Sequence, residues 1–505
     1  MDRHRPVVVG VGQLANKDEE RIVAPLDLIE AAVRLAVDDA GADVLAHVGA
    51  VLCPPSSVMV LDEDVPGRLA ERLGLAPGIR RQSAYSGAAP QELVAQAAEA
   101  IAEGRIEAAL IAGGIADASV RRARARGVEP PAPPTAPWSQ GSAAAPAPAE
   151  PPPRPRGYEG EMAAGVFEPV ASFAMAESVL AAAAGRSFDE QRVWLGTVLA
   201  PFTEVAAGRP DLAWFPVARD PAYLAGIRPD NRLVAGPYTK LMTSFPTVDL
   251  AAAVLVVSEE LADRLAVAQD RRVYPWAAAA CHEPHPPSER PHLEQPPAAT
   301  AAGQRALAAA GVTIDQVDLV DLYSCFPAAV QFGAAALGLP ATGTAATPLT
   351  VTGGLPYFGG PGASYTAHAI ACMVEECRAR PGDLGVVFGL GGLISSFAAG
   401  IYSTVASERP WAFDECADVE DELAGRRVTV DLDYEGPGTV EAMTVTHRRD
   451  TGPANAPVFV RLPDGSRSAA RPADPGLAAA VASTNLVGRP VTLRRDGKRV
   501  LYELT

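Results

Sequence analysis

The sequence predicts an α/β protein built from two similar halves, an inserted segment and an added β-domain. Three observations predict it. Strand-like runs without polar alternation, which are typical of sheets covered on both faces, end in glycine turns next to apolar helices. This arrangement occurs twice, in residues 81–114 and 350–397. Beyond residue 410 the texture changes to short runs rich in β-branched residues.

The first copy, residues 81–114, has a turn at Ser86 and Gly87, followed by a helix predicted for residues 88–103. A strand over residues 108–112 then ends in the pair Gly113–Gly114. Free backbone N–H groups and a partial positive charge at the start of such a helix suit a polar or anionic ligand.

The second copy, residues 350–397, repeats this order with a glycine-rich turn, a helix over residues 363–380 and a strand over 384–388. Residues 389–392 form its second glycine turn. A second pair of segments, VGAVLCP and VDLVDLYSCFP, is also similar. These repeats predict an internal duplication of roughly half-domain size. Both helices are apolar on all sides, so we expect them to lie buried between two mixed sheets.

The other elements of this part follow from apolar runs and helical periodicity. Strands are predicted at residues 6–11, 48–53, 248–257 and 317–325. Helices are predicted at residues 27–40, 65–73, 169–184, 188–207 and 300–310. Residues 128–157 are rich in proline and alanine, which predicts a loop or linker that cannot enter a sheet.

The composition excludes several classes of partner. A chain of 505 residues is too long for one core and predicts about three domains. A net charge of −17 argues against binding to nucleic acid or an anionic membrane surface. No apolar run is long enough to span a bilayer, and the six cysteines show no metal-like spacing. Reduced thiols in a cytoplasm fit this pattern.

The run CHEPHPPSERPH contains possible metal ligands, namely Cys281, His282, His285 and His292. Its prolines and irregular spacing favour a surface loop, so no metal site is predicted. The segment RPDNRLVAGPYTKLM contains Arg228, Arg232, Tyr238 and Lys240. Basic side chains among apolar ones suit a phosphate-bearing ligand, and solvated charges on a loop are the alternative.

The C-terminal region is predicted to be a small β-barrel, with an OB-type barrel as one form of it. Glycine-containing turns separate its predicted strands. These strands are residues 427–434, 439–447, 458–462, 491–495 and 500–503, with one helix at 476–482. An acidic connector, residues 411–425, predicts that this domain folds separately.

Residues 1 to about 407 resemble the thiolase superfamily, in particular the sterol-carrier-protein-type thiolases and their thiolase-like relatives. The resemblance depends on DNRLVAGPYTKLM with VDLAAAVLV, on VDLYSCF and on GGLPYFGGPGAS. It implies duplicated α/β halves in five layers, α-β-α-β-α, with a loop domain inserted into the first half. The implied domains are 1–115 with 247–278, the insert 116–246, the second half 279–407 and the barrel 408–505.

The same resemblance implies that the usual catalytic residues are replaced. The family has a nucleophilic cysteine in a Cys-x-Ser-Gly motif, and this chain has Ala84, Tyr85, Ser86 and Gly87 there. Alanine cannot attack a thioester. Ser86 matches a structural serine or threonine of the family, and no histidine aligns near it to act as a base.

The other family motifs are altered too. Tyr323 replaces the histidine of the His-Asp-Cys-Phe motif, which binds the thioester oxygen, and Cys325 retains its acid/base cysteine. Gly360 replaces the histidine of Gly-His-Pro, and Gly389 replaces the cysteine of Cys-x-Gly. Cys325 and Tyr323 are therefore the candidate catalytic residues, although a free cysteine is often only a small buried hydrophobe.

Three functions follow from this pattern. The first is binding of CoA or an acyl-CoA without thiolase chemistry, as in an acetyl-CoA acetyltransferase-like protein. The second is acyl transfer by an altered mechanism that uses Cys325. The third is aldol cleavage of an acyl-CoA with a lipid or steroid side chain, because thiolase-like aldolases have a tyrosine at the position of Tyr323 and pair with an OB-fold partner.

The expected ligand is CoA or acyl-CoA, with no tightly bound cofactor. Its predicted contacts are Arg228, Arg232, Tyr238, Lys240, Ser86 and Gly87. Family members usually form homodimers, and a monomer is the alternative because the added domain could cover that interface.

Overall fold

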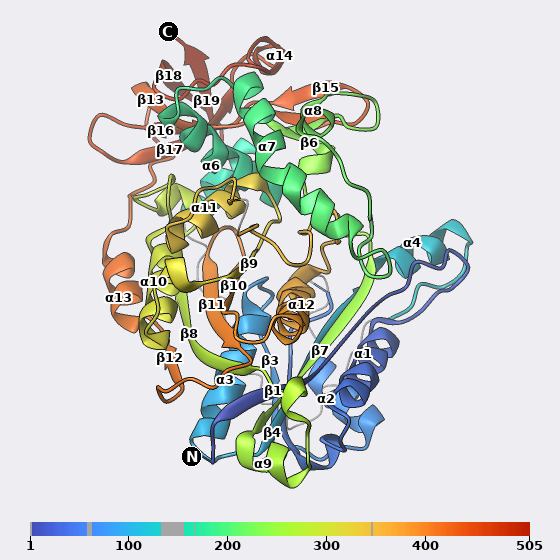
Figure 1. Ribbon diagram of the computed structural model, residues 1–505. Helices are drawn as coiled ribbons and strands as arrows, with labels where there is room; N and C mark the ends of the chain where they lie inside the picture. Colours follow the sequence, from blue (N-terminus) through green and yellow to red (C-terminus); the bar gives the residue numbers. More distant parts are fainter. Residues whose placement is uncertain (1–2, 58–62, 133–155, 167, 345–346) are drawn as a thin grey trace.

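The computed structural model describes residues 3–57, 63–132, 156–166, 168–344 and 347–505 of the chain. Its centre is a pair of five-stranded mixed sheets (Figure 1). In spatial order, the first sheet contains β1 (Pro6–Ala15), β7 (Asp249–Ser258), β4 (Ala108–Ala116), β2 (Val48–Cys53) and β3 (Ile79–Gln82). The second contains β12 (Ala412–Asp414), β8 (Tyr274–His282), β11 (Ser396–Ser403), β10 (Gly385–Gly391) and β9 (Leu319–Leu322).

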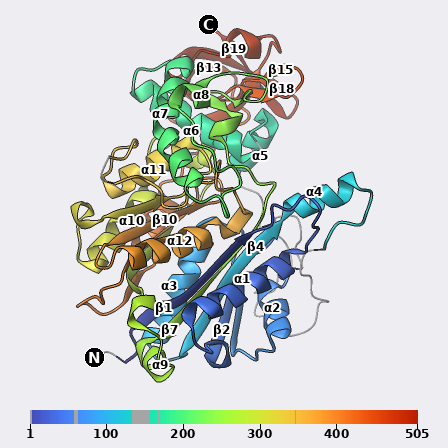
Figure 2. The ribbon, with the colours of Figure 1, turned by 45° about the vertical axis from the view of Figure 1, so that its right-hand side comes forward.

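Helices complete a five-layer α-β-α-β-α arrangement around these sheets (Figures 1 and 2). The outer face of the first sheet packs against α1 (Pro25–Ala40) and α2 (Val65–Leu73). The outer face of the second packs against α10 (Pro297–Ala310) and α11 (Pro327–Leu337). Between the sheets lie α3 (Ala89–Ala102) and α12 (Tyr365–Ala379).

The two central helices are buried, as their sequences predict. Most of their residues are alanine or other small or apolar side chains, which allow each helix to contact strands on both sides. Burial of this apolar surface contributes roughly 25 cal/mol per Å², and it is the main term that holds the layers together. The prediction of a sandwiched helix pair is confirmed.

The duplication is visible in the sheet topology. In the first sheet β7 pairs antiparallel with β1 and β4, and β4 pairs in parallel with β2. In the second sheet β11 pairs antiparallel with β8 and β10, and β10 pairs in parallel with β9. The order β1-β7-β4-β2 thus corresponds to β8-β11-β10-β9. Both β4 and β10 end in the glycine pattern that the sequence repeats.

The two halves divide at a different residue from the predicted boundary at residue 278. That residue lies inside β8, whose whole length pairs with β11 in the second sheet. The second half therefore begins before Tyr274. The boundary at 408 is also too early, because β12 is an edge strand of the second sheet and pairs in parallel with β8. Both boundaries depend on which strands pair with β8, and pairing between distant strands has no local signal in the sequence.

The inserted region is mainly helical; α4 lies beside the first sheet, and α6 and α7 lie between the sheets and the C-terminal barrel (Figure 1). Its helices are α4 (Asp117–Ala125), α5 (Arg156–Ala164), α6 (Pro169–Ala183), α7 (Phe188–Ala207) and α8 (Pro221–Ala225). A short hairpin, β5 (Leu233–Ala235) and β6 (Tyr238–Thr239), follows. The predicted proline-rich linker lies largely outside the described residues. No single described helix has the length and apolarity to span a membrane, and only the bent pair α5 and α6 reaches both by length and composition.

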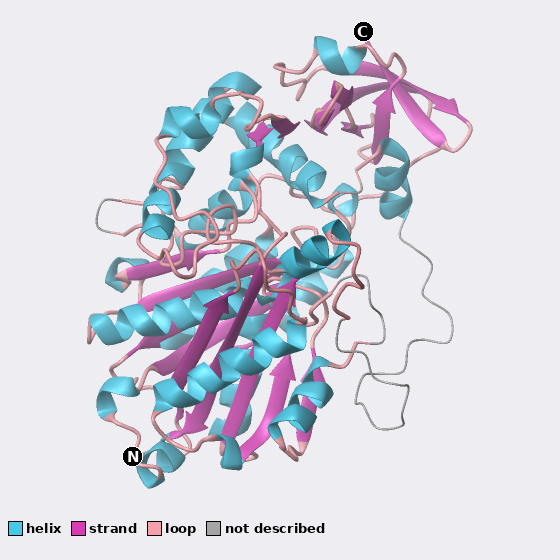
Figure 3. Cartoon of the chain, turned by 90° about the vertical axis from the view of Figure 1, so that its right-hand side faces the viewer, coloured by secondary structure: helices cyan, strands magenta, loops and turns pink. Residues whose placement is uncertain are grey.

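The C-terminal region forms a closed five-stranded barrel, as predicted (Figure 3). In spatial order its strands are β13 (Gly436–Met443), β16 (Val458–Arg461), β17 (Arg467–Pro472), β19 (Arg499–Leu504) and β18 (Pro490–Asp496). The parallel pairing of β17 with β19 supports an OB-type barrel, which stays a prediction. The predicted strand at residues 427–434 is wrong: it makes one isolated bridge, from Val430 to Arg467, and β17 takes its place.

The barrel contacts the insert and the second half, and its separate folding stays a prediction. Its strand β14 (Thr446–Arg448) pairs with β5 of the insert, and Phe188 of α7 belongs to the barrel's own apolar core. Arg467 is fully buried and donates hydrogen bonds to the carbonyls of Ser288 and Arg290, both at 2.8 Å. The connector itself forms α13 (Ala417–Gly425) on the second sheet. Strand alternation identifies the barrel but does not show what covers it.

Candidate functional site

The candidate site lies where the turns that precede α3 and follow β9 and β10 meet. A side-chain carbon added at Gly87 would lie 2.4 Å from the hydroxyl oxygen of Tyr323 and from the carbonyl oxygen of Leu390. One added at Gly391 would lie 2.1 Å from the hydroxyl of Ser86. The absence of side chains at these glycines lets the three turns touch. The predicted residues Tyr323, Ser86 and Gly87 are thus brought together.

Tyr323 dominates this meeting point. Its residue is 8% exposed, and its ring meets Tyr365 edge to face with centroids 5.4 Å apart. Burial raises the pKa of Tyr323 well above its ordinary value, and the nearby Cys325 and Tyr85 add to this effect. Its hydroxyl forms no hydrogen bond with any other described residue. The phenol is therefore protonated and is free to donate a hydrogen bond to a ligand.

Cys325 lies two residues before α11. It is 8% exposed, and burial raises the pKa of its thiol, an effect that the backbone N–H of Phe326 partly opposes. Its carbonyl oxygen accepts a hydrogen bond from the Ser244 N–H at 2.8 Å. At neutral pH this residue is a neutral thiol, which is a weak nucleophile and base.

The positions that the family uses for catalysis are filled as well as substituted. At Gly360, an added side-chain carbon would lie 2.1 Å from the hydroxyl of Ser244. At Gly389, it would lie 3.0 Å from the Cα atom of Ala88 and 3.3 Å from the hydroxyl of Thr366. Ala84 is exposed in the turn before α3. A histidine at residue 360 therefore requires the Ser244 side chain to move, and a cysteine at residue 389 is tightly confined by Ala88 and Thr366. The sequence does not predict the position of Ser244, because only the folded structure brings its hydroxyl to the place of a side chain at Gly360.

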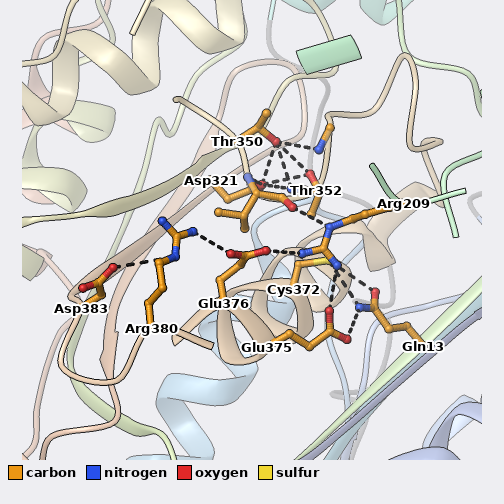
Figure 4. A network of polar contacts seen from close by, with 12 residues as sticks. Gln13, Arg209, Asp321, Thr350, Thr352, Cys372, Glu375, Glu376, Arg380 and Asp383 are labelled. Atoms are coloured by element: carbon orange, nitrogen blue, oxygen red, sulfur yellow. Dashed lines mark hydrogen bonds and ion pairs between the residues drawn. The ribbon is translucent and has the colours of Figure 1, made fainter. Parts of the chain in front are cut away.

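A buried polar network holds the glycine-rich turn that borders the site (Figure 4). The Asp321 carboxylate accepts hydrogen bonds from the backbone N–H groups of Val351 and Thr352, at 2.9 and 3.0 Å, and from the hydroxyls of Thr350 and Thr352. Burial raises the pKa of Asp321, and these bonds oppose the rise. Thr352 in turn contacts the hydroxyl of Tyr365, beside Tyr323.

Arg209, just after α7, connects the insert to the same turn (Figure 4). Its guanidinium donates to the carbonyl of Val351 at 2.9 Å and forms ion pairs with Glu375 and Glu376 of α12, at 2.8 and 2.9 Å. Because a planar guanidinium fixes three partners at once, it sets the position of the turn relative to the central helix.

A chain of polar groups joins Ser86 to the protein surface. The Ser86 hydroxyl lies 3.1 Å from that of Ser396, which donates to Glu92 at 3.0 Å. His282 lies 3.5 Å from Glu92 and 2.7 Å from Glu420 of α13. The two carboxylates, first Glu92, raise the pKa of His282 to about 9 against the opposing effect of burial. Sequence reasoning found no histidine near Ser86 because this contact crosses between the two halves.

The predicted basic residues Arg228, Arg232 and Lys240 make different contacts in the structure. Arg228 holds its own loop, donating to the carbonyl of Tyr223 at 2.8 Å and pairing with Asp230 at 3.3 Å. Arg232 donates to the carbonyl of Leu233, and its own carbonyl accepts from the backbone of the exposed Lys240.

Tyr238 does not fit the expected role in ligand binding. Its side chain is fully buried, and its hydroxyl donates to the Glu177 carboxylate at 2.8 Å. Burial raises the pKa of both groups, so Tyr238 is a neutral core residue. Strand β6 directs this side chain inward. The basic residues near it in the sequence favour a ligand-binding role instead.

A feature that sequence reasoning missed is the cluster of Arg219, Tyr223 and Arg228, here termed the Tyr223 cluster. Both guanidinium groups lie over the Tyr223 ring, 4.3 and 3.9 Å from its centroid. The preceding segment contains the exposed apolar residues Phe215 and Val217, and the Phe215 N–H donates to the carbonyl of Tyr357 in the glycine-rich turn. Phe215, in the segment before the cluster, therefore lies against the glycine-rich turn. Within the described residues, no group of side chains suits a metal ion.

Comparison with known proteins agrees with this architecture. Residues 418–498 match the family model of the thiolase-like protein type 1 additional C-terminal domain. None of the curated proteins compared with the sequence matches it. A solved structure, a monomeric SCP2-thiolase-like protein type 1 (STLP1) from Mycobacterium smegmatis, is 28% identical, with all of both chains covered and a TM-score of 0.83.

Two further structures share the fold at lower identity. The Ltp2-ChsH2(DUF35) aldolase is 20% identical, over 81% of this chain and 99% of that chain, with a TM-score of 0.58. The dimeric peroxisomal thiolase of Saccharomyces cerevisiae is 15% identical, over 80% of this chain and 98% of that chain, with a TM-score of 0.57. The chain thus has the thiolase fold and carries the additional C-terminal domain of the type 1 thiolase-like proteins.

Proposed function

We propose that this protein binds CoA thioesters and does not carry out ordinary thiolase turnover. The observation that supports the proposal best is the Tyr323 hydroxyl, a protonated donor with no partner of its own among the described residues. It lies against Gly87 at the turn before α3. A neutral phenol in this place can hold a thioester oxygen, but it supplies neither a nucleophile nor a base.

The Tyr223 cluster supports the CoA part of the proposal. In a chain of net charge −17, it holds the Arg219 guanidinium on an aromatic ring, and exposed apolar residues precede it in the same segment. Phosphates favour arginine, and a planar base stacks on guanidinium and aromatic surfaces. Lys240, exposed and without an ion pair in the described part of the chain, adds a further positive charge.

The closed positions at Gly360 and Gly389 support the absence of thiolase turnover. Loss of one oxyanion donor typically costs a hundredfold or more in rate. Here the nucleophile is alanine, and both histidine positions of the family are occupied by other residues. The neutral Cys325 thiol does not replace these groups.

All six cysteines are free, which supports a reducing cytoplasm as the location.

The test is calorimetric titration with CoA and acetyl-CoA, on the natural protein and on Tyr323→Phe. Removal of the phenol oxygen should weaken acetyl-CoA binding by about 2- to 10-fold, the equivalent of one net hydrogen bond, and should leave CoA binding unchanged. Tyr502→Phe is the matched control, since that hydroxyl donates to the Ala456 carbonyl in the barrel. Failure of every CoA species to bind would overturn the proposal.

Parallel activity assays separate the alternatives. Cleavage of acetoacetyl-CoA that disappears in Cys325→Ala would identify an acyltransferase instead. Cleavage of a β-hydroxyacyl-CoA that requires Tyr323 would identify an aldol lyase, the second candidate, which the shared fold of the Ltp2-ChsH2(DUF35) aldolase keeps open. The raised pKa of Tyr323 weighs against it, because a lyase base must give up the phenol proton.

A further inference from the structure

Two cysteines that are far apart in the sequence lie side by side at the edge of the second sheet. In the parallel pairing of β12 with β8, Asp414 lies opposite Ala279. Cys416 and Cys281 each follow two residues later, and Glu420, one turn of α13 beyond Cys416, contacts His282, the residue after Cys281. Both residues are fully buried, and the Cys416 thiol donates a long hydrogen bond to the carbonyl oxygen of Asp414 at 3.9 Å.

The backbone marks Cys416 independently. Its φ of 50° and ψ of 31° lie in the left-handed region, which residues with a β-carbon rarely adopt. The Asp414 carboxylate fixes this conformation by accepting from the Cys416 N–H at 2.8 Å. The strained turn ends β12 and begins α13.

The charged groups around the pair make the two thiols unequal. The interaction with the neighbouring Cys281 lowers the pKa of Cys416 and the cation of Arg305 acts in the same direction, whereas burial, Asp414 and Asp418 oppose the change. The same interaction with Cys416 raises the pKa of Cys281, as do burial and the nearby Glu420 and Glu283. Cys416 is therefore the thiol that reacts first with an electrophile.

We propose that Cys281 and Cys416 form a reversible disulfide when the protein meets a hydroperoxide. The Cys416 thiolate attacks one peroxide oxygen, the O–O bond breaks, and the other oxygen leaves as hydroxide that takes a proton from solvent, so that hydrogen peroxide yields a sulfenic acid and water. The Cys281 sulfur then attacks the sulfenic sulfur, and its proton leaves with the hydroxyl as a second water molecule. A cellular thiol reverses the reaction by exchange.

The pair becomes accessible by local opening of α13. This helix has nine residues, and most of its side chains are exposed or only partly buried. Short elements of this kind open with a much smaller free energy than the whole protein. Once formed, the disulfide would hold α13 on β8 next to the contact between His282 and Glu420. It would thereby restrict the motion of α13, which leads into the barrel.

Cys372 and Cys377 serve as an internal control. Both are buried in α12, and burial raises the pKa of each thiol. They are five residues apart on one helix and so point in different directions. A hydroperoxide that acts through the geometry described above should spare this second pair.

The experiment treats the full chain with hydrogen peroxide, blocks remaining thiols with iodoacetamide in denaturant, and maps the peptides by mass spectrometry. We expect a linked 281–416 peptide that dithiothreitol removes, and full alkylation of Cys372 and Cys377. Oxidation should also raise the unfolding temperature by a few degrees, since the bridge closes a long loop.

Two variants complete the test. Cys416→Ala should abolish both the linked peptide and the temperature shift, and Cys281→Ala should leave a sulfenic acid at Cys416 that dimedone labels. Circular dichroism checks that each variant is folded. Full alkylation of Cys281 and Cys416 after peroxide would overturn the inference, and so would equal cross-linking of Cys372 and Cys377. None of these results depends on CoA binding.

Discussion

Tyr323 occupies the space of a side chain at Gly87, where an added carbon would lie 2.4 Å from its Cζ atom and its hydroxyl, so that no side chain at residue 87 can coexist with the phenol in its present position. Gly87→Ala should therefore destabilise the protein by about 1–3 kcal/mol, because the Leu390 carbonyl also blocks the new methyl group. Urea unfolding measures this change. Gly41→Ala is not a suitable control because its φ is positive, whereas Gly425→Ala meets no atoms and should change stability little. Equal effects at both positions would contradict the packing described.

Restoring the catalytic residues of thiolases should not restore thiolase activity. The triple variant Ala84→Cys, Gly360→His, Gly389→Cys places side chains where Ser244 and Ala88 already lie. We expect slow self-acylation at residue 84, visible by intact mass, and no cleavage of acetoacetyl-CoA above background. Turnover in this variant at a rate typical of thiolases would show that these positions can open.

His282 should make stability dependent on pH. The pKa of His282 in the folded protein is about 9, above the ordinary value of about 6.5. Its contribution to the free energy of unfolding is therefore complete below about pH 6.5 and is lost as pH rises through 9. The side chain is 45% exposed, which reduces the expected effect to about 1 kcal/mol.

Unfolding by urea at pH 6 and pH 9.5 measures this loss. His282→Gln should flatten the difference between the two pH values. His292→Gln is the control, as that exposed ring pairs only with Glu294 in the described structure. A pH dependence that survives in His282→Gln would rule out this residue as its source.

Arg467→Met should weaken the attachment of the barrel. The variant leaves the Glu441 carboxylate without one of its two arginine partners and removes the donors to the carbonyls of Ser288 and Arg290. Breaking such a buried pair typically costs 3–5 kcal/mol. Hydrogen exchange should show faster exchange in β14 and β17, and Arg494→Met, on an exposed pair, should not. Unchanged exchange in Arg467→Met would contradict the role of this residue.

Arg219→Gln should weaken CoA binding by roughly 3- to 10-fold, the scale of one charge-assisted hydrogen bond. The loss should be smaller at high salt. Arg264→Gln, whose partner Glu107 lies on the outer surface of the first half, is the matched control. Binding that responds equally to both variants would point to overall charge instead of the Tyr223 cluster.

The sequence predicts the two halves, their central helices and the barrel because these depend on local periodicity and on repeated glycine turns. It does not predict the boundary at β8 or the edge strand β12, since both depend on pairing with distant strands. The site shows the same division. Tyr323, Ser86 and Gly87 follow from their motifs, whereas Ser244 and the contacts of Ser86 through Ser396 to His282 arise only in three dimensions.

The basic segment illustrates a third reason for failure. Arg228 and Tyr238 have the residue types of a phosphate site, but hydrogen bonds within the insert engage both side chains. Residue type alone does not show whether a side chain is already satisfied. The cation–aromatic contacts of Arg219 with Tyr223 depend on loop conformation, which has no periodic signal.

Phe188 belongs by sequence to the insert and by packing to the core of the barrel. Any change in the size of this side chain must be matched by a change in residues that lie more than two hundred positions later, such as Val440 or Tyr502. The insert and the C-terminal domain therefore cannot be exchanged independently between related proteins. Chimaeras that take both regions from one parent should fold, and those that split them should aggregate.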